Sequence, residues 1–382
     1  MNKALLDNNY NATEIEILEG LEPVRHRPGM YIGGTDDNAL HHLAIEIIDN
    51  CMDEVVAKYA TLISVQLFAD NTILISDNGR GIPIDNHPKF KNKSALEVIM
   101  TTLHSGGKFS NKNYTTSGGL HGVGASVVNA LSSFLKVQVI RGGVLYKQEF
   151  SKGLPTTKLN KIEATKKPNG TSILFKPDTS IFGENNFFSP DKLFKILEYK
   201  AYLFGGVQIN WECDASLTKE NSQTPHSKKI CYKNGIIDYI KFKTSTIPMF
   251  TSSTFDGNVK IEDENVEWVV AWLTNNETSF TETYCNTVPT PLGGSHELGF
   301  RHALTKGIRN FADIKGFKKA NEIIYDDLIN STGSILSIFI KNPQFQGQTK
   351  EKLVSLSSAK LVEIAIKDRF ETWLSNDLSV GE

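Results

Sequence analysis

The sequence predicts an α+β protein in which two units each combine a mixed sheet with helices. With 382 residues the chain is too long for one ordinary hydrophobic core, so two domains are expected. Strand-like and helix-like segments are interspersed along both halves without an internal repeat. The polar, proline-containing segment 214–229 is the best candidate for a boundary between the halves.

These observations divide the chain into an arm and two domains. Residues 1–12 are polar and rich in asparagine and form a candidate mobile arm. The first domain is expected at residues 13–222 and a second, smaller one at residues 223–382.

The elements of the first domain follow from apolar periodicity and turn residues. Thr13 is expected to cap a short helix over 14–21, and the segment 25–34 contains turn residues. Two strand-like runs flank Asp70–Asn71 and predict a hairpin, and Gly142–Gly143 joins another pair. We expect helices near 36–56, 94–104, 125–132 and 191–204, and strands near 63–69, 72–76, 135–141, 144–150, 171–177 and 207–213.

The second domain shows the same mixture of elements. The sequence predicts helices near 235–243, 296–312 and 357–375, and strands near 267–273, 280–288 and 334–341.

Composition narrows the class of protein. The chain is 40% hydrophobic and 22% charged, which is typical of a soluble globular protein. Its formal net charge of -2 provides no general attraction to nucleic acid, so any DNA contact has to be local. The four cysteines are scattered, which is typical of reduced thiols in the cytosol. Without a signal core or a membrane-length apolar run, an intracellular protein is expected.

A polar row on an otherwise apolar helix is the first candidate site. His42, Glu46 and Asn50 recur every four residues and share one face, with Asp49 and Asp53 beside it. The rest of the helix circumference is apolar, which is typical of a buried helix. A structural polar network would explain this row. A site would explain it too, with Glu46 polarising a water, His42 orienting Glu46 and Asn50 offering an oxygen to Mg²⁺.

Two further motifs are each ambiguous. In D-N-G-R-G-I-P, Asp77 either caps a turn or accepts a hydrogen bond from an exocyclic amine. In the second interpretation, Gly79 and Gly81 leave room for a planar ring against the backbone, and Ile82 and Pro83 form an apolar surface beside it.

The loop 105–124 is long and rich in glycine. It matches neither the P-loop nor the dinucleotide pattern, and H-E-L-G-F-R-H lacks the metalloprotease spacing. Its glycines allow backbone N–H groups to approach an anion, and Lys108 could add a charge. A structural turn would explain the glycines as well.

The three motifs in this order resemble those of the GHKL ATPase superfamily. The patterns are E-x-x-D-N from Glu46, D-x-G-x-G from Asp77 and G-x-x-G-x-G from Gly119. Further segments resemble the ATPase subunits of type II topoisomerases, among them G-L-E-P-V-R-H-R-P-G-M-Y-I-G and P-Q-F-Q-G-Q-T-K-E-K-L. Two segments resemble the ATPase subunits of topoisomerase IV more closely than those of gyrase, namely G-K-F-S-N-K-N-Y and C-N-T-V-P-T-P-L-G-G-S-H.

The resemblance implies a fold and a set of roles. It implies a GHKL (Bergerat) sandwich followed by a transducer domain with a ribosomal-protein-like fold. ATP and Mg²⁺ are the implied cofactors. Glu46 is the implied general base, oriented by His42; Asn50 is the implied metal ligand; Gln348 and Lys350 reach the γ-phosphate.

The same resemblance implies further contacts. Asp77 and Thr171 recognise adenine, Arg80 covers it and pairs with Glu54, and Arg141 matches an aminocoumarin-binding position. The full set of implied nucleotide-binding residues is Tyr10, Asn50, Asp53, Asp77, Arg80, Gly81, Ile82, Pro83, Lys108, Tyr114, Gly118, Gly119, Leu120, His121, Gly122, Val123, Gly124, Thr171, Gln348 and Lys350.

The implied partners are a second copy of the chain in an ATP-dependent homodimer, a DNA-cleaving subunit in a heterotetramer, double-stranded DNA and aminocoumarin inhibitors. No D-x-D run or E-G-D-S segment occurs, so the chain is expected to hydrolyse ATP without cleaving DNA by itself. The expected location is the bacterial cytoplasm, at the nucleoid, with no membrane partner.

The ATPase subunit of gyrase and a chaperone-like GHKL clamp are the alternatives to a topoisomerase IV subunit. The basic segment 301–319 is either a solvated helix face or part of a DNA-lined cavity.

Overall fold

The computed structural model describes most of the chain. The described residues are 15, 17–108, 116–119, 122–218, 222–274, 279–347 and 349–381. Five of the implied site residues lie outside these ranges, namely Tyr10, Tyr114, Leu120, His121 and Gln348. The expected arm at 1–12 is outside them as well.

The first half is built on one mixed sheet with the strand order β11-β10-β1-β2-β9-β5-β6-β7, and β8 pairs with β6. Strands β1 and β10 run parallel, whereas β1–β2, β2–β9 and β5–β9 are antiparallel. The strands are β1 (Leu62–Leu67), β2 (Ile73–Asp77), β5 (Ser132–Arg141), β6 (Val144–Ser151), β7 (Leu154–Pro155), β8 (Asn160–Ala164), β9 (Gly170–Pro177), β10 (Gln208–Cys213) and β11 (Ser227–Ile230). A separate short pair is formed by β3 (Asn86–His87) and β4 (Phe90–Ser94).

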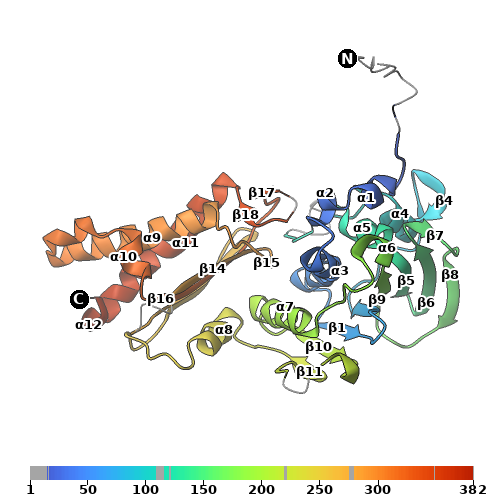
Figure 1. The fold of residues 1–382 in the computed structure, drawn as a ribbon. Helices are drawn as coiled ribbons and strands as arrows, with labels where there is room; N and C mark the ends of the chain where they lie inside the picture. Colours follow the sequence, from blue (N-terminus) through green and yellow to red (C-terminus); the bar gives the residue numbers. More distant parts are fainter. Residues whose placement is uncertain are drawn as a thin grey trace, which may run out of the picture.

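Helices cover one face of this sheet (Figure 1). Alternate residues of the central strands, such as Ile63, Ile75 and Val137, are at most 1% exposed and share a core with the helices. The helical elements of this half are α1 (Glu22–His26), α2 (Gly29–Ile32), α3 (Asp37–Val56), α4 (Ala95–Thr101), α5 (Gly124–Ala130), α6 (Thr179–Phe182), α7 (Pro190–Leu203) and the 3₁₀ turn η2 (Ala215–Leu217).

Helix α3 lies at the centre of this half and is buried along most of its length. Apolar residues such as Leu43 and Ile48 are fully buried, and the absence of Gly and Pro favours the helix. The side chain of Asp36 caps its first turn by accepting a hydrogen bond of 2.9 Å from the backbone N–H of Ala39. The long buried helix that the sequence predicts is therefore confirmed.

The second half has a sheet with the order β12-β13-β16-β14-β15. Its strands are β12 (Phe255–Ile261), β13 (Glu264–Trp272), β14 (Phe280–Cys285), β15 (Val288–Pro289) and β16 (Thr332–Phe339), and a separate pair is formed by β17 (Phe345–Gln346) and β18 (Lys352–Leu353). The helical elements are α8 (Ile236–Lys243), α9 (Ser295–Lys315), η4 (Lys318–Glu322), α10 (Tyr325–Ile329), α11 (Leu356–Asn376) and α12 (Leu378–Gly381).

Both faces of this second sheet are covered. Trp268 of β13 belongs to a core with α9 and α11, whereas its neighbour Val269 belongs to a core with α8 and the end of α7. Strand β16 is buried at every position, as expected for a strand packed on both sides. Because α7 belongs to the first half, its Tyr202 and Leu203 connect the two halves through apolar packing. Figure 1 shows α7 between the first sheet and α8.

The structure corrects some of the expected elements. Residues 15 and 17–19 are not helical, so the short helix expected over 14–21 is wrong where it is described. Instead, α1 has Pro23 among its first positions and ends within the segment 25–34 that we interpreted as turns, and α2 lies inside that segment. Strand β11 extends the first sheet to Ile230, beyond the expected boundary, and the division into domains remains a prediction. Among the described residues, no helix is both long enough and apolar enough to cross a membrane.

The cap of α3 generates a first prediction. Asp36→Ala removes the acceptor for the Ala39 N–H, so the free energy of unfolding should fall by about 1 kcal/mol. Asp36→Asn keeps an oxygen acceptor and should stay close to wild type. Chemical denaturation of the three proteins measures this difference, and equal stability of the alanine and asparagine variants would contradict the role of the cap.

Candidate active site

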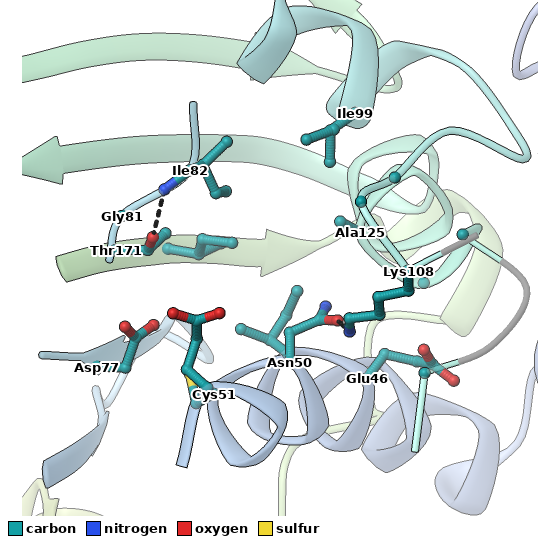
Figure 2. Close-up of a pocket in the computed structure, with 18 of the residues that line it drawn as sticks. Glu46, Asn50, Cys51, Asp77, Gly81, Ile82, Ile99, Lys108, Ala125 and Thr171 are labelled. Carbon is teal, nitrogen blue, oxygen red and sulfur yellow. Dashed lines mark hydrogen bonds between the residues drawn. The ribbon is translucent and has the colours of Figure 1, made fainter. Parts of the chain in front are cut away.

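A cavity of about 310 Å³ lies between α3, the ends of β2 and β9, and the glycine-rich loop. Figure 2 shows Glu46 and Asn50 pointing into it from α3, Asp77 at the other end, and Lys108 reaching toward Asn50. Most of the described residues that the resemblance implies line this cavity, namely Glu46, Asn50, Asp77, Arg80, Gly81, Ile82, Pro83, Lys108, Gly119, Gly122, Val123, Gly124, Thr171 and Lys350. The sequence motifs, which are far apart in the chain, therefore converge on one site.

Glu46 is held between a histidine and a lysine. His42 Nε2 lies 3.2 Å from Glu46 Oε1, and Lys350 Nζ lies 3.9 Å from the same oxygen. Burial by itself raises the pKa of the Glu46 carboxyl, but Lys350, His42 and then Lys108 outweigh it and lower the pKa to about 2. The carboxylate is therefore ionised and tightly held in this state of the site.

Lys350 reaches this position from the second half of the chain. It is only 5% exposed, and its backbone adopts the left-handed region at φ 59. Its ammonium also donates a hydrogen bond of 3.2 Å to the carbonyl of Gly118. Burial lowers its pKa, but Glu46, Asp49 and Asp53 outweigh that effect and raise it, so Lys350 carries its charge.

Asn50 Oδ1 is occupied by a cation of the protein itself. Lys108 Nζ lies 2.6 Å from Asn50 Oδ1 and 2.5 Å from Asp53 Oδ2. A carbonyl oxygen that faces a cavity and holds an ammonium also fits Mg²⁺, which takes oxygen ligands and keeps several waters. The described residues contain no group of three or more His, Cys, Asp or Glu side chains that could hold a metal by themselves. Mg²⁺ bound at Asn50 would take its other oxygen ligands from water and from a bound phosphate.

Asp77 lies at the apolar end of the cavity. Its Oδ1 accepts a hydrogen bond of 2.8 Å from the Gly79 N–H, and Thr171 is its cross-strand neighbour. Burial raises the pKa of Asp77 to about 6; the Gly79 N–H opposes this effect, and the nearby Glu54 adds to it. Thr171 Oγ1 accepts a hydrogen bond of 3.2 Å from the Ile82 N–H, which fixes the loop that walls the cavity (Figure 2).

Two arginines frame the same end. Arg80 Nη2 lies 2.6 Å from Glu54 Oε1, which is the pairing that the resemblance implied, and its guanidinium lies 3.8 Å from the centre of the Tyr59 ring. Arg141 donates a hydrogen bond of 2.7 Å to the carbonyl of Gly81 and lines the cavity.

The glycine-rich loop packs closely against two carboxylates of α3. A Cβ at Gly124, where α5 begins, would lie 2.1 Å from Glu46 Oε2. The N–H groups of Gly118 and Gly119 donate to Asp53 at 2.7 and 3.2 Å. Asp53 therefore binds the loop backbone and does not line the cavity. His42 does not line the cavity either, but it contacts Glu46, which does.

Sequence reasoning missed several contributors. Cys51 lines the cavity, and the interaction of its thiol with Asp77 lowers the pKa of that carboxyl, although the position of Cys51 in the apolar face of α3 gave no sign of this. Asp49, which had no assigned role, pairs with Lys200 at 2.6 Å, and both side chains are buried. Only the three-dimensional packing of α7 against α3 brings this lysine to the helix.

The basic segment 301–319 is partly neutralised. Arg301 pairs with Glu297 at 2.6 Å and Lys306 with Glu363 at 2.5 Å. Arg309 donates to the carbonyl of Ile323 at 2.6 Å. Carboxylates therefore compensate two of the cations of this segment.

Comparisons with known proteins agree with this geometry. Residues 35–181 match the family described as histidine kinase-, DNA gyrase B- and HSP90-like ATPase, and residues 235–382 match the family described as DNA gyrase B. The B-type subunit of DNA topoisomerase 4 from Rickettsia bellii is 50% identical over 99% of this chain, and that from Salmonella typhimurium is 40% identical over 99%. The chain spans 57% and 58% of the lengths of these two relatives.

Solved structures show the same relationship. The topoisomerase IV ATP-binding domain of Francisella tularensis, in complex with a small-molecule inhibitor, has a TM-score of 0.78 and 33% identity, with 96% of this chain and 94% of that chain covered. The 43K ATPase domain of Thermus thermophilus gyrase B, in complex with an aminocoumarin, has a TM-score of 0.76 and 34% identity, with 94% and 91% covered.

The sheet, the buried acidic helix and the glycine loop around one cavity define a GHKL-type ATPase fold. Within that class, the chain belongs to the family of bacterial type II topoisomerase ATPase subunits, which contains the B-type subunits of topoisomerase IV and of gyrase.

The raised pKa of Asp77 predicts a pH dependence of stability. Its pKa is 3.8 in the unfolded chain and about 6 in the fold, so the folded protein binds the proton more tightly and loses stability as pH rises through this window. Asp77→Asn cannot ionise. Its stability relative to wild type should therefore increase by about 3 kcal/mol between pH 3 and pH 7. Denaturation at a series of pH values measures this, and a difference that is constant with pH would refute the assignment.

Proposed function

We propose that the chain is the ATP-binding and ATP-hydrolysing part of a B-type subunit of topoisomerase IV, in which nucleotide closes a dimeric gate around DNA. The observation that carries this proposal is the position of Lys350. A buried lysine from the second half lies 3.9 Å from Glu46 and lines a cavity whose other lining residues belong to the first half. A ligand that binds Lys350 from this cavity would connect the two halves.

The cavity supports ATP as that ligand. The Asp77 carboxylate can accept a hydrogen bond from the adenine amine, and Ile82 and Pro83 supply an apolar wall. At the opposite end, Lys108 and Lys350 can bind phosphates together with the backbone N–H groups of the glycine loop. Tyr10, Tyr114, Leu120, His121 and Gln348, which the resemblance adds, remain proposals outside the described residues.

Glu46 is the proposed general base for the attacking water. A carboxyl with a pKa of about 2 is a weak base, because a good general base has a pKa near the working pH. Lys350 is the main group that lowers the pKa against burial, so its transfer to a γ-phosphate would raise the basicity of Glu46. Phosphate binding and activation of the base would then be one event, with His42 fixing the carboxylate orientation.

Mg²⁺ would be held by Asn50 Oδ1, after Lys108 has moved from this oxygen to a phosphate. When bound, the metal neutralises negative charge on the phosphates. Lys108, Lys350 and the loop N–H groups would provide the remaining electrostatic stabilisation, which is the main protein contribution to phosphoryl transfer.

The identities of the relatives support topoisomerase IV over gyrase. We propose an ATP-dependent homodimer in which Tyr10 of the arm contacts the nucleotide bound to the partner copy. We also propose a heterotetramer with a DNA-cleaving subunit, in the bacterial cytoplasm at the nucleoid. The proposed boundaries of the arm and the two domains remain 1–12, 13–222 and 223–382. Aminocoumarin binding is proposed at Arg141, which lines the cavity.

Decatenation by the reconstituted enzyme would support topoisomerase IV, whereas ATP-dependent supercoiling would identify a gyrase.

Removal of the proposed base tests the chemistry. Glu46→Ala should abolish ATP turnover while the binding of a non-hydrolysable ATP analogue persists, because the phosphate and adenine contacts remain. ATP turnover and analogue affinity are the measurements, and dimerisation with the analogue should be retained. Turnover close to wild type in this variant would eliminate Glu46 as the base.

The proposed DNA contact is tested on the basic segment 301–319. Charge reversal at Lys318 and Lys319 should reduce the stimulation of ATP turnover by DNA, and its salt dependence, without changing basal turnover. Lys229→Glu, an exposed lysine on the first sheet, is the control. Unchanged stimulation in the double variant would leave a solvated helix face as the explanation of this segment.

A further inference from the structure

A strained two-residue turn lies beside the proposed nucleotide site. Asn286 and Thr287 connect β14 to β15, and their φ values are 50 and 65. A turn with two left-handed residues normally uses Asn-Gly, because a β-branched threonine is unfavourable in this region. Both residues are nevertheless only 1% exposed. Contacts outside the hairpin must therefore hold the turn in this conformation.

The side chain of Asn286 supplies contacts to both halves. Its Nδ2 donates 2.7 Å to the carbonyl of Ser117 in the glycine loop and 3.0 Å to the carbonyl of Ile340. Its Oδ1 accepts 2.9 Å from the N–H of Ile340. A Cβ at Gly118 would lie 2.9 Å from the Asn286 carbonyl, so the loop and the turn are in direct contact.

Thr287 is connected to helix α3 through Lys200. Lys200 Nζ donates 2.6 Å to the carbonyl of Thr287 and lies 2.6 Å from Asp49 Oδ1. Lys200 is 3% exposed and Asp49 is 5% exposed, so the pair is shielded from water. An ion pair buried in this way is sensitive to the removal of either partner.

The contacts of Asn286 reach the loop segment that also binds Lys350. Gly118 donates its N–H to Asp53 of α3 and accepts a hydrogen bond from Lys350 at its carbonyl. Its neighbour Ser117 is bound by Asn286. The short segment 117–119 is therefore clamped between α3 on one side and two separate elements of the second half on the other.

We propose that Asn286 and Lys200 are positioning residues that align Lys350 with the γ-phosphate by fixing the second half against segment 117–119 and α3. This inference rests on the proposed function of the site as an ATPase. Neither side chain lines the cavity, so both act through the geometry of other residues. Lys350 and the turn 286–287 then each connect the second half to segment 117–119.

The test uses the difference between ATP and ADP, because only ATP has a γ-phosphate to meet Lys350. Asn286→Ala should bind ADP with an affinity within about twofold of wild type. Its affinity for a non-hydrolysable ATP analogue should fall about tenfold or more, and its kcat should fall between about tenfold and a hundredfold. Asn258→Ala is the control, since it removes an asparagine side chain from β12, at the edge of the same sheet opposite the turn. It should resemble wild type in all three measurements.

A double-variant cycle separates positioning from general packing. If Asn286 acts through Lys350, Asn286→Ala combined with Lys350→Met should be no worse in kcat than Lys350→Met alone. For Lys200, the paired change Asp49→Leu with Lys200→Met avoids an isolated buried charge, and it should reduce the preference for the ATP analogue over ADP in the same way.

The outcomes are distinguishable. An Asn286→Ala variant with a lower melting temperature but an unchanged ATP-to-ADP preference and kcat overturns the inference. Effects of Asn286→Ala and Lys350→Met that multiply would overturn it as well. A wild-type protein that binds the ATP analogue no more tightly than ADP, or fails to hydrolyse ATP, contradicts the proposed function itself.

Discussion

The structure depends on three carboxylates that α3 carries into the interior. Glu46, Asp49 and Asp53 are 9%, 5% and 1% exposed, and buried carboxylates are costly unless a cation compensates them. Each one has a lysine from a different part of the chain. The first lies near Lys350, the second pairs with Lys200, and the third pairs with Lys108, at 3.9, 2.6 and 2.5 Å.

These three lysines connect helix α3 to the glycine-rich loop, to α7 and to the second half of the chain. Lys108 comes from the glycine-rich loop, Lys200 from α7 and Lys350 from the segment between β17 and β18. A ligand that attracts one of these lysines changes the balance of charge along the whole helix. Negative phosphates entering the cavity would attract Lys108 and Lys350, and thereby free Asn50 for metal and Glu46 for proton transfer. Lys200, which lies outside the cavity, would keep Asp49 compensated throughout.

Much of the cavity follows from local patterns in the sequence. Helical periodicity places Glu46 and Asn50 on one face, and the order of the motifs after it predicts that Asp77 and the glycines belong to the same site. The burial of α3 follows from its apolar circumference. The hairpin of β1 and β2 follows from the Asp70–Asn71 turn.

Other contributors leave no local pattern. Lys200 is one of several lysines on an amphipathic helix, and only the packing of α7 identifies it as a buried partner of Asp49. Asn286 lies within the strand that we expected over 280–288, which was wrong at its end, and no local pattern indicates the turn after β14 or its contact with Ser117. The short helices α1 and α2 were missed because their proline and glycine content is equally typical of turns.

The central claim is that Lys350 transfers from the protein to the γ-phosphate and so connects nucleotide to the second half. A crystal structure with a non-hydrolysable ATP analogue and Mg²⁺ tests it directly. The account predicts that Lys350 Nζ leaves the Gly118 carbonyl and contacts the γ-phosphate, that Asn50 Oδ1 binds the metal in place of Lys108, and that a water lies against Glu46. A bound analogue with Lys350 still on Gly118 and no contact to the γ-phosphate would contradict it.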